Sequence, residues 1–376
     1  MSFGSVAVVG GGINGLCIAW ELARRGWQVE LFERNRCLTQ TSSASTKLLH
    51  GGLRYLEQGH LALVAESLRE RARWLREVPQ HCHWLPLLLP IYKQQARPAW
   101  HWRLGLGLYD GLALGQLPGF ARWLNPDAVL QRQPGLKADG LLGAWQFWDG
   151  QMDEQALGGW VERQARSVGV VIYEHSEVQR VDAAGDITAV APGFGDGAPS
   201  LHSYTWVVNA CGPWAVELLE RSGIPSPVQL DLVRGSHLLV PPPPGVGLPD
   251  EGFFVEVPGS RRIAFLLPYK GDLLVGTTEQ AQQLNEPARA NLVEQEQLLG
   301  LVSHYLPAWL PNAQQHGRWF TGLRPIVRSR ADVSSASREA DVQRYGRLLT
   351  VFGGKWTTAR ALAERFVSAA PFNGQP

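Results

Sequence analysis

Residues 6–34 contain the feature that most constrains how this chain can fold. A short apolar run is followed by Gly10, Gly12 and Gly15 in the spacing Gly-x-Gly-x-x-Gly, then by a segment of helical periodicity and a second apolar run that ends at Glu33. This order predicts a strand–helix–strand unit whose first turn binds a dinucleotide. The alternative is a glycine-rich turn in an ordinary α/β core.

Each part of this segment has a physical role in the prediction. The three glycines would permit, in order, a tight turn, a close approach of the backbone to a pyrophosphate, and close packing of helix on strand. The helix N-terminus would attract the anion through its N–H groups and its dipole. Glu33 lies near the spacing expected of an acid that binds a ribose hydroxyl.

The composition argues against several classes of protein. The 376 residues carry a formal net charge of +1, which does not favour nucleic-acid binding. The four cysteines have the spacing of neither a zinc site nor an iron–sulfur cluster, so we predict no metal and reduced thiols in a cytoplasmic protein. Residues 1–5 carry no positive charge, and there is no apolar run of about 18 residues, so neither a signal peptide nor a spanning helix is expected.

The length fits two domains, or one domain with a large insertion. Helices are predicted from apolar periodicity and capping residues at 61–78, 153–167 and 359–369. Strands without long helices between them, which predict an antiparallel sheet, are expected at 230–240, 253–257, 263–267 and 273–277. An apolar run at 348–352, followed by Gly353 and Gly354, predicts a return of the chain to the first sheet.

The predicted fold class is therefore α/β with an α+β insert. A Rossmann-like nucleotide-binding domain is expected to comprise residues 1–78, 150–215 and 316–376, and an antiparallel-sheet substrate or cap domain residues 79–149 and 216–315.

Residues 98–124 mix tryptophan, phenylalanine and arginine with many leucines. Such a mixture is typical of a patch that lies on a membrane surface. A buried helix with an aromatic wall explains it equally well. If the patch binds lipid, the protein is peripheral on the inner face of the cell membrane.

The layout favours a flavin enzyme. Only one dinucleotide fingerprint is present, which argues against an enzyme with two nucleotide-binding domains. A hydroxyl-rich loop at 41–46 and the late glycine turn at 353–354 suit a long cofactor that stretches across the sheet. An NAD-dependent dehydrogenase could share the first thirty residues, but it would not need these two segments.

Several motifs resemble those of FAD-dependent glycerol-3-phosphate dehydrogenases, within the wider superfamily of D-amino-acid oxidase-like flavoenzymes. The longest are Thr41-Ser-Ser-Ala-Ser-Thr-Lys-Leu-Leu-His-Gly-Gly-Leu-Arg-Tyr-Leu-Glu57 and Phe352-Gly-Gly-Lys-Trp-Thr-Thr358. Shorter ones, in the same order as in the family, are Arg234-Gly-Ser-His237, Gly276-Thr-Thr278 and Gly322-Leu-Arg-Pro325. The resemblance runs from the start of the chain to about Val367.

The resemblance implies a flavoprotein oxidoreductase of glycerol metabolism. Its reaction would be hydride transfer from C2 of sn-glycerol 3-phosphate to N5 of FAD, giving dihydroxyacetone phosphate, with electrons passed to quinone or another acceptor. The alternative is an FAD-dependent oxidase or dehydrogenase of a 2-hydroxy acid or an amino acid. A third possibility is a non-catalytic flavoprotein module, against which the charged and imidazole residues named next argue.

Candidate residues for the chemistry follow from the charges involved. A phosphate dianion in a dry site needs fixed cations, for which Arg324 and Arg54 are the first candidates and Arg338 a weaker third. Tyr55, beside Arg54, is placed with them as a substrate-binding residue. Surface arginines are the alternative for each.

Proton removal and charge stabilisation require further groups. His237 or His50 would accept the proton of the C2 hydroxyl, with His237 slightly favoured. Lys355, at a helix start after two glycines, would stabilise negative charge on the N1–C2=O edge of the flavin or bind the substrate phosphate.

The remaining candidates are assigned to the cofactor. They are Gly10, Gly12, Gly15, Glu33, Thr41, Ser42, Ser43, Ser45, Thr46, Val178, Ala210, Gly212, Gly322, Gly353, Gly354, Lys355 and Thr357.

The sequence departs from the family pattern in two places. The family usually carries a further C-terminal helical domain, and this sequence stops at Pro376, which leaves dimerisation and partner contacts open. After Gly322-Leu-Arg-Pro325 the family tends to be acidic, whereas here the sequence is Val327-Arg-Ser-Arg330. This added charge predicts either a more anionic substrate or a surface pair of arginines.

Overall fold

A computed structural model describes residues 4–190, 199–328, 340–369 and 371–372. Its first layer is a six-stranded sheet in the order β18-β19-β11-β1-β2-β7, in which only the β18–β19 pair is antiparallel. The strands are β1 (Ser5–Val9), β2 (Gln28–Phe32), β7 (Val171–Tyr173), β11 (Trp206–Asn209), β18 (Asp341–Tyr345) and β19 (Leu348–Phe352).

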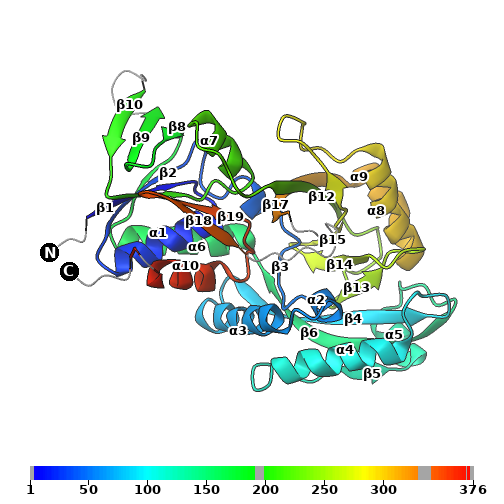
Figure 1. Cartoon of the computed structure of the whole chain (residues 1–376). Coiled ribbons are helices and arrows are strands. Elements are labelled where there is room, and N and C mark those ends of the chain that lie inside the picture. The colour runs from blue at the N-terminus through cyan, green and yellow to red at the C-terminus, as the bar shows by residue number, and fades with distance from the viewer. Residues whose placement is uncertain (1–3, 191–198, 329–339, 370, 373–376) are drawn as a thin grey trace.

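Both faces of this sheet are covered. Helices α1 (Ile13–Arg24), α6 (Glu154–Ser167) and α10 (Ala359–Ser368) share one apolar cluster on one face. On the other face lie α7 (Ala215–Arg221) and a small antiparallel sheet of β8 (Glu177–Val181), β9 (Asp186–Val190) and β10 (Ser200–Ser203) (Figure 1). Parallel sheets need such double coverage because their strands are apolar on both sides.

The second layer is a ten-stranded, mostly antiparallel sheet in the order β16-β12-β15-β14-β13-β4-β6-β3, with β17 paired to β12 and β5 to β6. Its elements are β3 (Leu48–Leu49), β4 (Cys82–Tyr92), β5 (Arg122–Leu124), β6 (Leu141–Met152), β12 (Leu230–Val240), β13 (Gly252–Glu256), β14 (Ile263–Tyr269), β15 (Asp272–Gly276), β16 (Gln280–Ala281) and β17 (Arg318–Val327).

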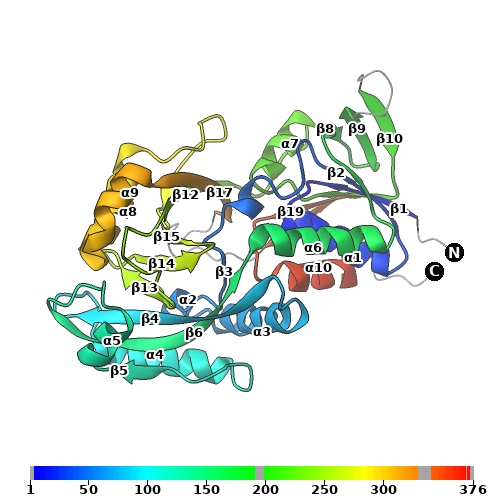
Figure 2. The same cartoon turned by 180° about the vertical axis from the view of Figure 1, so that it is seen from behind.

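Helices enclose this sheet as well. One apolar cluster includes residues of α5 (Pro126–Arg132), α8 (Leu292–Tyr305), the 3-10 turn Pro307–Trp309 and α9 (Leu310–His316). Another includes residues of α3 (Leu61–Glu77) and α4 (Ala99–Leu112), with the short α2 (Arg54–Glu57) beside them. Figure 2 shows the two layers side by side, with β6 leading from the large sheet towards α6.

The predicted fold class is confirmed: the molecule has a Rossmann-like layer and an antiparallel layer. The helices expected at 61–78, 153–167 and 359–369 are present within one or two residues of those bounds. Not predicted were β4, β6 and α8. The apolar residues of β4 form a run broken by Pro86 and Pro90, so alternation does not mark it as a strand.

The division into two domains stays a prediction, but two segments pair differently from it. Strand β3 falls inside 1–78, which is predicted to belong to the nucleotide domain, yet it pairs with β6 of the large sheet. Strand β17 falls inside 316–376, which is predicted to belong to the nucleotide domain, yet it pairs with β12 of the large sheet over Leu230–Leu239. Pairing between distant strands depends on tertiary contacts, which the periodicity of one segment does not reveal.

No helix in the part of the chain that the structure describes is long and apolar enough to cross a membrane.

Candidate active site

A long cavity of about 340 Å³ lies between the two layers. The carboxyl ends of β1 and β2, the loop 39–46 and the turn 353–357 line its nucleotide side, and β12, β17 and the loop after β15 line the other. Ligands of open parallel sheets bind at the carboxyl ends of the strands, where the crossing connections leave a crevice. The cavity therefore occupies the place where the fold binds a cofactor.

The glycine turn has the geometry that the fingerprint predicts. Gly10 has φ +110°, and a Cβ there would lie 2.6 Å from the carbonyl oxygen of Ala210. A Cβ on Gly15 would lie 2.0 Å from the carbonyl oxygen of Gly10, which explains the close packing of α1 on the turn. Glu33 lines the cavity, and its carboxylate accepts backbone N–H groups from Gly11 (2.8 Å) and Asn35 (2.9 Å).

The loop 39–46 is tied to three distant elements. The Ser42 hydroxyl accepts the N–H of Ile13 at the start of α1 (3.0 Å), and the Thr41 hydroxyl donates to the carbonyl of Leu323 on β17 (2.7 Å). The indole of Trp356 donates to the carbonyl of Ser42 (3.1 Å). The hydroxyl-rich sequence therefore supplies side-chain bonds that hold a loop against a polar ligand site.

Three buried polar atoms in the cavity wall test whether FAD fits. Oδ1 of Asn14, Oγ1 of Thr357 and Nδ1 of His237 have no hydrogen-bond partner among the described residues. Buried polar atoms are nearly always paired in native proteins, so these three fit a polar ligand. Together with the glycine turn and the hydroxyl loop, the wall has the donors and acceptors that a flavin dinucleotide needs.

Lys355 is buried in this wall. Its ammonium donates to the carbonyl of His50 (2.8 Å) and to the hydroxyl of Ser67 (3.1 Å). The N–H on the other side of that peptide, from Gly51, donates to the hydroxyl of Tyr109 (2.8 Å). One peptide unit is thus held from both sides, which fixes the backbone beside Lys355.

The Tyr109 hydroxyl also forms a hydrogen bond with one member of a buried ion pair. It donates to Asp149 (2.9 Å), which also accepts from Nη1 of Arg71 (2.6 Å). Arg71 is fully buried, and its Nε and Nη2 atoms have no hydrogen-bond partner among the described residues. Burial raises the pKa of Asp149, and Arg71 opposes that shift.

His237 is a neutral imidazole in the wall. Its ring stacks on Phe320 with a centroid separation of 4.8 Å, and Nε2 lies 3.0 Å from the hydroxyl of Thr46. Burial, together with the positive charges of Arg324 and Lys47, holds the pKa of His237 well below its ordinary value. A neutral ring can accept a hydrogen bond or a proton at one nitrogen.

An arginine cluster closes the substrate side. Arg324 donates from Nη2 to the hydroxyl of Thr277 (2.8 Å) and the carbonyl of Thr278 (3.1 Å). A Cβ on Gly235 would lie 1.8 Å from that Nη2, so the glycine of Arg234-Gly-Ser-His237 makes room for a guanidinium on the neighbouring strand. Arg54 and Arg262 lie near Arg324, since all three form ion pairs with Glu279.

The cavity brings together nearly all predicted site residues of the described chain. Its lining includes Gly10, Gly12, Glu33, Thr41, Ser42, Ser45, Thr46, His50, Arg54, Tyr55, Val178, Ala210, Gly212, His237, Arg324, Gly353, Gly354, Lys355 and Thr357. Gly15 lies behind the turn. Ser43 and Gly322 line a second cavity, of about 440 Å³. Arg338 and Arg330 lie outside the described residues, and Arg328 is a surface side chain paired with Asp231.

Sequence reasoning missed several residues of the site. Asn14 stands inside the glycine fingerprint, where its position was a signal. Glu279 and Asp149 carry no motif, because their importance depends on arginines distant in sequence. Lys47 lies within a quoted motif, and it forms a buried ion pair with Glu154, which also accepts from Ser45.

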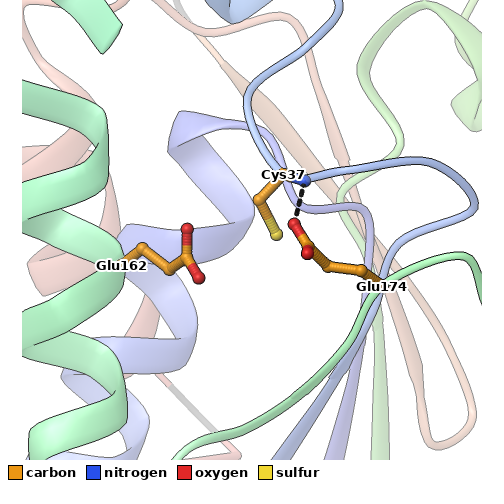
Figure 3. Close-up of side chains that lie close together, drawn as sticks. All are labelled: Cys37, Glu162 and Glu174. Atoms are coloured by element: carbon orange, nitrogen blue, oxygen red, sulfur yellow. Dashed lines mark hydrogen bonds between the residues drawn. The ribbon is translucent and has the colours of Figure 1, made fainter. Parts of the chain in front are cut away.

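One group of potential metal ligands occurs in the described residues: Cys37, Glu162 and Glu174 (Figure 3). Glu174 accepts the backbone N–H of Cys37 (2.7 Å). Burial raises the pKa of the Cys37 thiol, which opposes the thiolate that a metal would need. These groups are explained by packing and a backbone hydrogen bond.

Comparison with known proteins reveals extensive similarity. The profile of the FAD dependent oxidoreductase family matches residues 5–368. A glycerol-3-phosphate dehydrogenase of Pseudomonas aeruginosa is 34% identical over 96% of this chain and 70% of its own length. The mitochondrial glycerol-3-phosphate dehydrogenase of Arabidopsis thaliana is 30% identical over 98% of this chain, which spans 61% of that protein.

A solved structure supports the fold. The glycerol-3-phosphate dehydrogenase of Bacillus halodurans, complexed with FAD, matches with a TM-score of 0.74 and 24% identity. The match covers 97% of this chain and 63% of that one. The chain thus spans somewhat less than two thirds of the length of some of these relatives.

Proposed function

We propose that this chain, which belongs to the family of FAD dependent oxidoreductases, oxidises sn-glycerol 3-phosphate to dihydroxyacetone phosphate. When bound, FAD supplies the acceptor of the hydride from C2. The observation that carries the proposal is the convergence of Arg54 and Arg324 with the neutral His237 in one cavity on the flavin-binding fold. The names of the relatives, glycerol-3-phosphate dehydrogenases, support the same substrate.

The chain's own residues divide into those for cofactor and those for substrate. The glycine turn, Glu33, the loop 39–46 and the turn 353–357 would hold FAD, with Lys355 opposing negative charge on it. Arg324 and Arg54 would bind the phosphate, because guanidinium groups match two of its oxygens at once.

Proton removal is proposed to occur at His237. Its Nδ1 atom has no hydrogen-bond partner among the described residues, and its lowered pKa keeps the ring neutral at physiological pH. The substrate hydroxyl would donate to this atom and lose its proton there as the hydride leaves. His50 is the second candidate, because it also lines the cavity.

The test is an anaerobic visible spectrum of the FAD-loaded protein before and after addition of sn-glycerol 3-phosphate. We expect the flavin absorption to bleach at a rate that saturates with substrate. Bleaching by a 2-hydroxy acid or an amino acid, and not by glycerol 3-phosphate, would instead select the alternative, in which Arg324 binds a carboxylate. A colourless protein that does not take up FAD would contradict both.

We also propose that residues 98–124 contact a membrane surface. A quinone in that membrane would then accept the electrons from the reduced flavin. Helix α4 buries Trp102, Leu106 and Tyr109, so one of its faces forms part of the core. The opposite face exposes Trp100 (64%), Leu104 (66%) and Leu108 (44%), and Phe120 nearby is 66% exposed. Apolar side chains on one helix face, with the exposed Arg103 among them, are typical of interfacial binding.

Vesicles that contain phosphatidylglycerol should sediment the protein at low salt. Leu104→Glu is expected to reduce the bound fraction about tenfold, because it removes one buried leucine and adds a negative charge. Leu201→Glu, on β10 at the far end of the molecule, is a matched control because Leu201 is 69% exposed. Equal binding by both variants, or none by the parent protein, would contradict the contact.

A further inference from the structure

Glu279 lies among three arginines at the substrate end of the long cavity. Its Oε1 is 3.6 Å from Nη1 of Arg54 and 3.9 Å from Nη1 of Arg324, and its Oε2 is 3.6 Å from Nε of Arg262. These side chains are 20–29% exposed, so they are shielded from water only in part. A carboxylate thus lies where the proposed function expects the anionic group of the substrate to bind.

The three contacts are ion pairs longer than hydrogen bonds. N–H···O bonds have donor–acceptor distances of roughly 2.7–3.2 Å, and all three separations exceed that range. The attraction between Glu279 and the arginines is therefore Coulombic and adds little geometric constraint. An anion with more oxygens, such as phosphate, would bind the same guanidinium groups at shorter range.

The arginines are held in place by other groups. Arg324 donates to Thr277 and Thr278, and Arg262 donates to the carbonyl of Thr277 (3.2 Å). Thr278 is anchored in turn, because its hydroxyl donates to the buried Glu294 (2.7 Å). Removing the charge of Glu279 would therefore leave at least Arg262 and Arg324 in position.

We propose that Glu279 is an internal counter-ion, which competes with the anionic group of the ligand for Arg54 and Arg324, the two of these arginines that line the cavity. This rests on the proposed function for the identity of the ligand, a phosphate monoester. Before the ligand binds, Glu279 offsets the mutual repulsion of the three guanidinium groups. When the ligand is bound, the same charge repels its phosphate, which lowers affinity and favours release of the product.

An internal counter-ion differs from other roles of Glu279 in the direction in which anion affinity changes when its charge is removed. In Glu279→Gln the side chain keeps its size and loses its charge, so anion binding should become tighter. A residue that binds substrate through its charge, or that accepts a proton in the reaction, would show weaker binding or a slower rate when so changed. A purely structural residue would show loss of FAD or of stability, and no gain of affinity.

The experiment measures the binding of inorganic phosphate to the FAD-loaded protein, in a phosphate-free buffer, by isothermal titration. We expect Glu279→Gln to lower the dissociation constant about tenfold, which corresponds to about 1.4 kcal/mol, with a steeper dependence on salt. Glu279→Asp, which keeps the charge, should remain near the parent value. Glu296→Gln removes an exposed carboxylate on α8 that lines neither cavity, so it serves as the matched control.

Two results would overturn the proposal: phosphate affinity in Glu279→Gln that is unchanged or weaker, or equal tightening in Glu279→Asp. The flavin spectrum of each variant shows whether it has folded and bound FAD. Failure of the proposed function gives a different pattern, because glycerol 3-phosphate would then not bleach the flavin even where Glu279→Gln tightens phosphate. If the substrate is correct, the KM for glycerol 3-phosphate should fall in Glu279→Gln together with the phosphate dissociation constant.

Discussion

Arg324→Ala is expected to raise the KM for glycerol 3-phosphate about a hundredfold while FAD stays bound, because Arg324 is only 20% exposed and removing one partner of a shielded charged contact costs roughly 2–5 kcal/mol, with the lower end of that range expected for a partly buried group. Arg324 lines the substrate side of the cavity, and its Nη2 is fixed by Thr277 and Thr278. Steady-state kinetics, with flavin content measured from the visible spectrum, check the result.

Two further variants sharpen this prediction. Gly235→Ala should also raise KM, because its Cβ would lie 1.8 Å from Nη2 of Arg324 and force the guanidinium to move. Arg328→Ala is the control, since Arg328 is 55% exposed and pairs with Asp231 instead of lining the cavity. A parental KM in Arg324→Ala would remove this residue from the substrate site.

Asp149→Asn is expected to lower the free energy of unfolding by about 3–5 kcal/mol, because it leaves the buried Arg71 without a compensating charge. The two side chains are 6% and 0% exposed, and their nearest atoms lie 2.6 Å apart. Tyr109 would also lose its charged acceptor. Urea unfolding followed by tryptophan fluorescence, at a fixed FAD concentration, measures the change.

The matched control is Asp231→Asn, which removes the same charge from the surface pair with Arg328. Exposed pairs contribute about 0–1 kcal/mol, so this variant should stay close to the parent. A loss below about 1 kcal/mol for Asp149→Asn as well would mean that Arg71 is compensated in another way.

Local patterns were sufficient for the nucleotide half of the fold. The strand–helix–strand unit and the glycine turn depend on contacts between neighbours in sequence and on glycine geometry. The return of the chain at 348–369 has a strand–glycine–helix pattern of its own, although β19 pairs with the distant β11. The large sheet was predicted only in part, because β4 and β6 pair along 82–92 and 141–152, about fifty residues apart. A strand whose partner lies so far away carries little local signal.

For the site as well, the sequence predicted which residues take part but not their surroundings. Motif residues such as His50, Arg54, His237 and Lys355 do line one cavity. Their environments were not predictable: the pKa of His237 is lowered by burial and by Arg324 and Lys47, which only the packing brings near it. The sequence of 98–124 is compatible with both a membrane patch and a buried helix, and in the structure its helix has one buried and one exposed face.

By itself, the sequence determined the flavin-binding architecture and the residue types available for chemistry, since both follow from spacing along one segment at a time. Only the tertiary structure decided which charges meet. It places Glu279 beside Arg54, Arg262 and Arg324, and it buries Asp149 in an ion pair with Arg71. The reason is physical: Coulombic energy depends on distance in space and on burial, and neither is encoded in separation along the chain.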